Sequence, residues 1–103
     1  MMKKIKLTLQ ENHIRQIIFK HLNPKDYKVF LFGSRAQDTA GKWSDYDIGV
    51  KHKQGKKLSE TVKEALKKEL ESSDIPYIIE IVDFATVSDK FKKVALDKKV
   101  LWN

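Results

Sequence analysis

The fold is decided by residues 28–50, which read KVFLFGSRAQDTAGKWSDYDIGV. Residues 28–32 form an apolar run rich in β-forming side chains, and Gly33-Ser34 ends it, which indicates a buried strand. After an irregular segment, residues 45–50 alternate in side-chain character with a period of two, which predicts a second strand. The alternation places the acidic residues of this strand on one face and its apolar residues on the other.

The rest of the chain is predicted to alternate helices with one further strand. Thr8 to Glu11 has the capping-box pattern and apolar residues follow at helical spacing, so a helix is expected over about residues 9–21. A second helix begins after Ser59 and ends near residues 72–74. The segment 76–82 is strongly strand-like, and a last helix opens near Ser88. We expect an α/β (α+β) fold, in which helices pack on a small mixed sheet of about three strands, as a single domain over residues 1–103.

Composition excludes several classes of protein. The chain has no cysteine, so it has no disulfide, thiolate metal site or cysteine nucleophile. No apolar run approaches the length that spans a bilayer, and we expect a cytoplasmic protein. The formal net charge of +7 attracts polyanions. The lysines are spread along the chain with few aromatic residues among them, which favours a solvated surface over a nucleic-acid site.

Gly33-Ser34 is a candidate anion site. It lies where a buried strand gives way to an irregular segment, so backbone N–H groups and the Ser34 hydroxyl can point together at an anion. Glycine allows a close approach of the backbone. Taken alone, the dipeptide is more often only a turn.

Asp45 and Asp47 are candidate metal ligands. Two positions apart on a strand, their Cα atoms lie roughly 6–7 Å apart on one face. The two carboxylates repel each other unless cations neutralise them, and a pair of Mg²⁺ ions about 3.5–4 Å apart is the usual arrangement for displacement at a phosphate. The alternative is two solvated acids on the outer face of an edge strand. It is disfavoured here because Ile48 and Val50 form the opposite, core-facing set.

Glu80 is the one carboxylate within an apolar strand, and its burial without a partner would cost several kcal/mol. If this strand lies beside residues 45–50, Glu80 can complete a site of three carboxylates. Asp83 is the competing candidate. It has the opposite alternation parity and sits at the end of the strand, which favours a role as a helix or turn cap.

Together these segments resemble a known family. Gly33-Ser34, ten further residues and then Asp45-Tyr46-Asp47 match the Gly-Ser-x(10)-Asp-x-Asp signature of the minimal nucleotidyltransferases, small relatives of the DNA polymerase beta palm. The segment 80–84 is similar to the strand that carries the third carboxylate of that family, and Leu101-Trp102 to its apolar-aromatic ending. The resemblance covers nearly the whole chain and implies a polymerase beta palm-like fold.

The resemblance also implies an activity, Mg²⁺-dependent transfer of a nucleoside monophosphate, most often AMP from ATP, to a hydroxyl acceptor. The residues that it implies for the metals and for the acceptor hydroxyl are Asp45, Asp47 and Glu80. Those that it implies for the phosphates are Gly33, Ser34 and Arg35 or Lys42. Family members of this size often pair with an all-helical HEPN-type toxin. The nucleotidyltransferase is then the antitoxin, which transfers AMP to a tyrosine of its partner.

Two other functions compete with this interpretation. The first is a catalytically silent module of the same fold that neutralises a partner protein by contact alone, and that would tolerate loss of the acidic residues. Because all three acids are present, activity is favoured. The second is a basic nucleic-acid-binding protein, whose affinity would fall steeply with salt. Without a stacking aromatic motif or an arginine-rich helix it ranks third.

Overall fold

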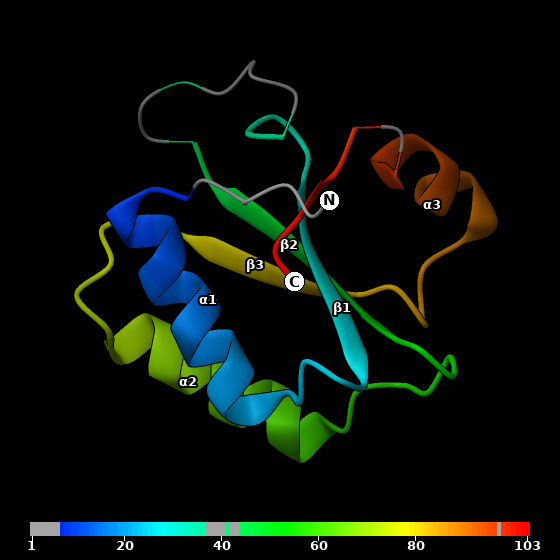
Figure 1. The fold of residues 1–103 in the computed structure, drawn as a ribbon, viewed down its shortest axis with the longest axis horizontal. Coiled ribbons are helices and arrows are strands. Elements are labelled where there is room, and N and C mark those ends of the chain that lie inside the picture. Colours follow the sequence, from blue (N-terminus) through cyan, green and yellow to red (C-terminus); the bar gives the residue numbers. More distant parts are fainter. Residues whose placement is uncertain (1–6, 37–40, 42–43, 97) are drawn as a thin grey trace, which may run out of the picture.

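A computed structural model describes residues 7–36, 41, 44–96 and 98–103, except for the side chains of Val94 and Leu96. Helices and strands follow one another along the chain in the order predicted from the sequence, with one short strand added at the end (Figure 1). Their bounds are α1 Leu9–His21, β1 Tyr27–Phe32, β2 Tyr46–His52, α2 Glu60–Ser72, β3 Ile79–Asp83, α3 Asp89–Leu96 and β4 Val100–Leu101. No helix in these ranges is both long and apolar enough to cross a membrane.

The strands form a mixed sheet in the order β3-β2-β1-β4. β1 pairs antiparallel with β2 and β4, whereas β2 and β3 are parallel, with α2 in the connection between them. The expected mixed sheet is confirmed, and a fourth strand adds to the three expected. β4 is only two residues long, and such a segment has no periodicity from which a strand could be predicted.

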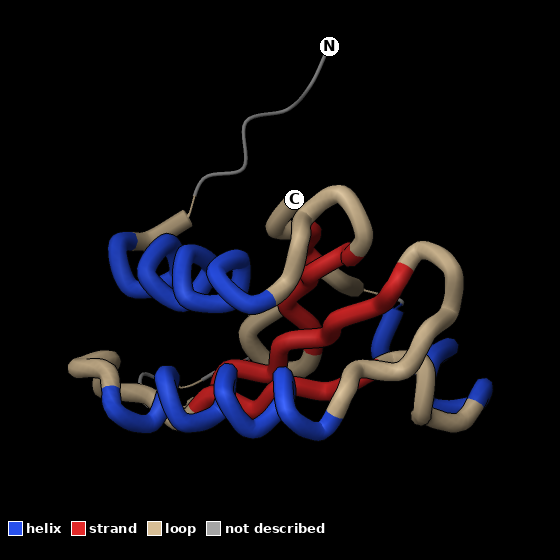
Figure 2. Tube along the Cα trace, turned by 90° about the horizontal axis from the view of Figure 1, so that it is seen from below, coloured by secondary structure: helices blue, strands red, loops and turns tan. Residues whose placement is uncertain are grey.

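Side chains alternate between two faces of the sheet. The larger core lies under α1 and α2, whose apolar stripes pack on one face of the sheet. Both views place α3 apart from these two helices (Figures 1 and 2). A smaller core lies under α3 and consists of Phe30, Phe32, Phe84 and Ala95. Because neighbouring residues of a strand point to opposite faces, β1 contributes to both cores.

The helices begin where their capping residues predict. In the capping box of α1, the Thr8 hydroxyl accepts a hydrogen bond from the Glu11 N–H at 3.1 Å, and the Glu11 carboxylate accepts one from the Thr8 N–H at 2.9 Å. Ser59 caps α2 in the same way, and the Ser88 hydroxyl accepts from the Phe91 N–H before α3. These caps satisfy N–H groups that have no partner within the helix.

The last described residues close the larger core. Trp102 is fully buried, and its backbone N–H donates to the Val29 carbonyl at 2.8 Å. Arg15 of α1 donates from Nε to the Trp102 carbonyl at 2.6 Å, and the Asn103 side chain accepts from the Val29 N–H. The segment after β4 therefore ties β1 to α1.

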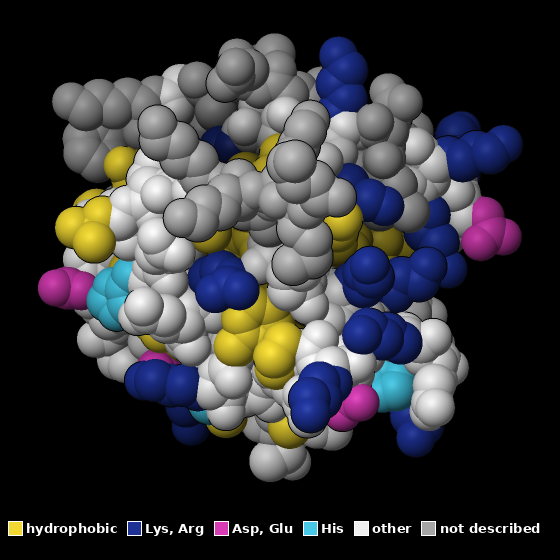
Figure 3. Space-filling view, in the orientation of Figure 1, with side chains coloured by type: hydrophobic (Ala, Val, Ile, Leu, Met, Phe, Trp, Pro, Cys, Tyr) yellow, Lys and Arg dark blue, Asp and Glu magenta, His cyan; other side chains and the backbone are white. Residues whose placement is uncertain are grey.

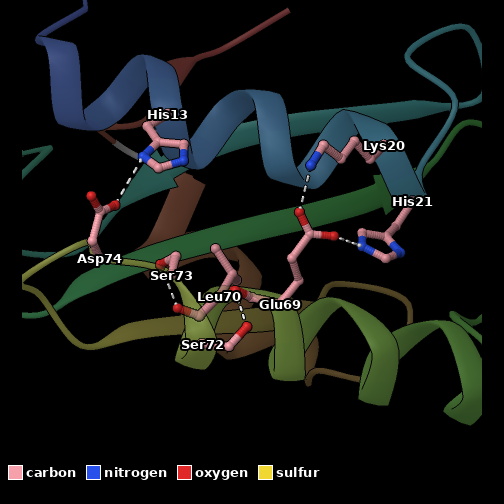
Figure 4. Close-up of polar contacts among 8 residues, drawn as sticks. All are labelled: His13, Lys20, His21, Glu69, Leu70, Ser72, Ser73 and Asp74. Atoms are coloured by element: carbon pink, nitrogen blue, oxygen red, sulfur yellow. Dashed lines mark hydrogen bonds and ion pairs between the residues drawn. The ribbon is translucent and has the colours of Figure 1, made fainter.

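A charged cluster joins α1 to α2. Glu69 accepts hydrogen bonds from Lys20 Nζ and pairs with His21 Nε2, both at 2.8 Å (Figure 4). The hydrogen bond from Lys20 makes the largest contribution, and that with His21 the next largest, to holding the pKa of the Glu69 carboxyl below its ordinary value of 4.5. A carboxyl whose pKa is lower in the folded state stabilises the fold above its unfolded pKa, and this contribution is lost as pH falls through the folded pKa.

We therefore expect Glu69→Gln to destabilise the protein at pH 6 and to have progressively less effect as pH falls below the ordinary carboxyl pKa of 4.5. Urea unfolding at several pH values measures this difference. Glu71→Gln, an exposed position on the same helix, serves as the control and should be neutral throughout. A Glu69→Gln effect that does not change with pH would show that the cluster contributes nothing through ionisation.

Candidate active site

The sheet brings two of the predicted carboxylates to neighbouring positions. Asp47 on β2 and Glu80 on β3 are register partners in the parallel pair, so β3 lies beside β2 as the predicted site requires. Asp45 is exposed and immediately precedes β2. Tyr46 and Ile48 belong to the core under α1 and α2, so the alternation turns Asp47 to the opposite face. The acids therefore gather on the α3 side of the sheet.

The environment of Asp47 disfavours its charge. Partial burial, then the charge of Glu80, then that of Asp45, raise the pKa of the Asp47 carboxyl above its ordinary value. Like charges act on one another in this way only when they are close, and a bound cation would reverse the effect. The charges of Glu80 and Asp45 therefore both act on the Asp47 carboxyl.

Gly33 brings the turn after β1 against the Asp47 carboxylate. Its φ of +76° lies in the left-handed region, and a Cβ at this position would overlap Asp47 Oδ2. The turn is closed by a 3.2 Å hydrogen bond from the Ala36 N–H to the Gly33 carbonyl. Ser34 follows in the same turn and is half-buried. Gly33 of the predicted anion site therefore lies beside Asp47, one of the predicted metal ligands, and Ser34 follows it in the chain.

Arg35 is held against the residues at the start of β2. Its Nε and Nη2 atoms both donate to the Ser44 carbonyl, at 2.9 and 2.7 Å. The guanidinium carbon also lies 4.0 Å from the ring centre of Tyr46 and 4.8 Å from that of Tyr77. These contacts were not predicted, because nothing in the spacing of the chain marks the two tyrosines as partners. Lys42, the other predicted phosphate ligand, lies outside the described residues.

Asp83, the alternative third carboxylate, has a different place. It is buried, and its Oδ2 accepts from the Leu58 N–H at 2.8 Å while Oδ1 accepts from the Ala85 N–H at 3.0 Å. It pairs in register with Val50, three residues along β3 from Glu80, and so points to the other face. The geometry gives Asp83 a capping role in the turn before α2 and in the turn after β3.

The donor chemistry fits magnesium. Carboxylate oxygens are the ligands that Mg²⁺ prefers, and this ion usually binds one or two protein carboxylates together with substrate phosphates and waters. Within the described ranges, no three acidic, His or Cys side chains are already arranged as a complete metal site. Asp47 and Glu80, which are register partners on β2 and β3, supply oxygen ligands of the kind that Mg²⁺ prefers.

A lysine-lined hollow of about 360 Å³ marks the far end of the same sheet face, and Figure 3 shows cationic side chains gathered there, on the right of the view. Its lining residues are Lys28, Phe30, Lys51, His52, Lys53, Lys99 and Leu101. The ring of Phe30 is only 2% exposed. Phe30 therefore offers no open ring face of the kind that stacks single-stranded bases.

A mixed sheet that sets a Gly-Ser turn against paired carboxylates, with helices on both faces, defines a nucleotidyltransferase fold. The model of the nucleotidyltransferase domain family matches residues 14–101, and the chain belongs to this family. A similar curated protein, the probable protein adenylyltransferase MntA of Haemophilus influenzae, is 33% identical over 85 residues, which are 82% of this chain and 72% of that protein.

Solved structures share the fold. A toxin–antitoxin crystal structure with AMP-PNP superposes with a TM-score of 0.71 at 23% identity, over 91% of this chain and 72% of the other. A complex of a tri-AMPylated Shewanella oneidensis HEPN toxin with its MNT antitoxin gives a TM-score of 0.66 at 22% identity, over 90% and 68%. At these identities the likeness shows the fold alone.

Proposed function

We propose that this nucleotidyltransferase is a Mg²⁺-dependent protein adenylyltransferase, which transfers AMP from ATP to a tyrosine hydroxyl of a HEPN-type partner and acts as its antitoxin. The observation that carries the proposal is the juxtaposition of Asp47 with Glu80 across β2 and β3, with Gly33 packed against Asp47. This arrangement puts a phosphate-binding turn and a cation site next to each other, as nucleotidyl transfer requires.

The relatives supply the substrate classes. The Haemophilus influenzae protein is named as a probable protein adenylyltransferase, which supports AMP as the transferred group. One solved neighbour holds AMP-PNP and another is bound to an AMPylated HEPN toxin, which support ATP as donor and a HEPN-type protein as acceptor. The tyrosine is implied by the family resemblance of the Gly-Ser-x(10)-Asp-x-Asp signature. The use of ATP and the absence of cysteine suit a cytoplasmic protein.

Each residue has a defined part in the transfer. The acceptor oxygen bonds to the α-phosphorus of ATP while the bond to the β-phosphate oxygen breaks, and pyrophosphate leaves. We assign to Glu80 the removal of the hydroxyl proton, and to Gly33 and Ser34 the binding of the β- and γ-phosphates. Asp45, Asp47 and Glu80 would hold magnesium, which when bound neutralises charge on the phosphates. Positioning and charge neutralisation account for most of the rate.

Transfer of label tests the proposal. The purified chain is incubated with α-³²P-labelled ATP, Mg²⁺ and a HEPN-type protein of the same organism. We expect the partner protein to become labelled, and labelling to be lost when its acceptor tyrosine is replaced by phenylalanine. Chelation of the metal should abolish labelling. A chain that binds and silences the partner without any transfer, with either Mg²⁺ or Mn²⁺, would establish the contact-only module in place of the enzyme.

We expect Ser34→Ala to raise the KM for ATP about 10- to 100-fold, since a hydrogen bond to a charged group contributes about 1.5–3 kcal/mol. Its effect on the affinity for Mn²⁺ alone should be small, because the hydroxyl is assigned to the phosphates. Steady-state kinetics and calorimetry measure the two quantities. Ser59→Ala removes the cap of α2 and is the matched control: stability falls, but the KM stays as in the wild type. Unchanged KM in Ser34→Ala would leave Gly33-Ser34 as a plain turn.

A further inference from the structure

Arg35 contacts both backbone segments that carry the acidic residues, the one around Asp45 and Asp47 and the one before Glu80. Its guanidinium donates twice to the carbonyl of Ser44, the residue bonded to Asp45. It also lies over Tyr46, which separates the two aspartates, and over Tyr77, three residues before Glu80. One side chain thus contacts residues adjacent to both aspartates and a residue three positions before Glu80.

The contacts suit a rigid anchor. The two tyrosine rings meet edge to face, with centres 5.2 Å apart, and the planar guanidinium lies near both. The Tyr46 N–H donates to the Ile78 carbonyl at 2.9 Å, just before the paired part of β3. Arginine combines a fixed fork of donors with a flat face that stacks on rings, and lysine has neither property.

We infer that Arg35 is a positioning residue, whose guanidinium holds the starts of β2 and β3 in the register that sets Asp45, Asp47 and Glu80 beside one another. The inference rests on the proposed function and deepens it. It assigns to Arg35 a role different from the phosphate contact that the sequence suggests. Because a misplacement of about 1 Å can cost about 100-fold in rate, such an anchor is expected to govern turnover more than ATP affinity.

Kinetics of Arg35→Lys and Arg35→Ala separate the two roles. If Arg35 positions the carboxylates, kcat for pyrophosphate release with the HEPN-type partner falls about 100-fold in both variants, and the KM for ATP changes by less than about threefold. Tyr77→Leu, which removes one of the two rings, should lower kcat in the same way but by less. The inference would be overturned if Arg35→Lys kept the wild-type kcat while Arg35→Ala raised the KM for ATP about tenfold or more. That result would establish a contact between Arg35 and the phosphates.

Arg15→Lys is the matched control. Arg15 also donates to a backbone carbonyl, that of Trp102, and also lies over a ring, with 5.1 Å between its guanidinium carbon and the centre of Phe19. Its substitution should lower the melting temperature and leave kcat and KM unchanged. An equal loss of kcat in Arg15→Lys would mean that kcat falls with any general destabilisation of the fold, and the inference would fail.

Hydrogen exchange tests the anchor without turnover. In folded Arg35→Lys, amides of residues 44–47 and 78–80 should exchange faster than in the wild type, while those of α2 should not change. Unchanged exchange in these two segments overturns the inference whatever the kinetics show. If the wild type itself releases no pyrophosphate but exchange accelerates as expected, the proposed function fails and the anchor stands.

Discussion

Asp47→Asn is expected to lower the rate of AMP transfer by about 1,000-fold or more, because the substitution removes the charge that faces Glu80 across β2 and β3 and that would hold the metal. Labelled-ATP transfer and pyrophosphate release measure the loss. Calorimetry should show that metal-dependent ATP binding is lost as well. Asp74→Asn, at an exposed position after α2, carries the same chemical change away from the site and should retain full activity.

The same variant should also be more stable than the wild type when no metal is present. The raised pKa of Asp47 means that the folded protein disfavours the ionised carboxyl. A carboxyl whose pKa is higher in the folded state makes its full contribution to stability when it is protonated, at low pH. This contribution is lost as pH rises through the folded pKa. Asp47→Asn removes that loss, so its melting temperature should exceed that of the wild type at pH 7 and approach it in acid. Undiminished transfer in this variant would contradict the site assignment.

Glu80→Gln should reduce activity and leave the fold stable, whereas Asp83→Asn should reduce stability and leave activity unchanged. This is the second large difference that we expect. Glu80 is exposed and pairs in register with Asp47, so its loss should reduce transfer by about 100-fold or more in a protein that stays folded. Asp83 is buried and accepts two backbone N–H groups, so its amide variant should lose about 1–3 kcal/mol of unfolding free energy. The folded fraction of that variant should transfer AMP normally.

Urea unfolding and labelled-ATP transfer, measured on both proteins at a temperature where each is folded, make the comparison. An active Glu80→Gln protein beside an inactive, folded Asp83→Asn protein would place the third metal ligand on Asp83. That outcome would require Asp83 to leave its two N–H partners and turn to the other face of β3, which its alternation parity opposes.

Much of the fold could be predicted because its signals are local. The capping box at Thr8 and Glu11 and the apolar spacing after it define α1 with both of its ends as observed. The third strand was predicted from residue 76, but β3 begins at Ile79, because Tyr77 packs against Arg35 and Tyr46 before the ladder starts. Such a contact depends on segments that are distant in sequence.

The site shows the same division. Period-two alternation predicted that Asp45 and Asp47 share one face and that Glu80 and Asp83 point to opposite faces, since parity is a property of one strand. The approach of Gly33 to Asp47 and the anchor made by Arg35 are tertiary contacts between three segments. The family resemblance of the Gly-Ser-x(10)-Asp-x-Asp spacing implied that the turn and the aspartates share one site. No spacing in the chain encodes the contacts of Arg35, so only the folded structure could reveal them.

The burial of Trp102 affects when the protein can finish folding on the ribosome. β1 is synthesised early, but the backbone group that pairs with Val29 and the largest fully buried side chain belong to residue 102. Removing a buried tryptophan side chain typically costs about 3–5 kcal/mol, a large share of the 5–15 kcal/mol that holds a small protein together. A nascent chain that has not yet emerged through residue 102 therefore exposes an incomplete core.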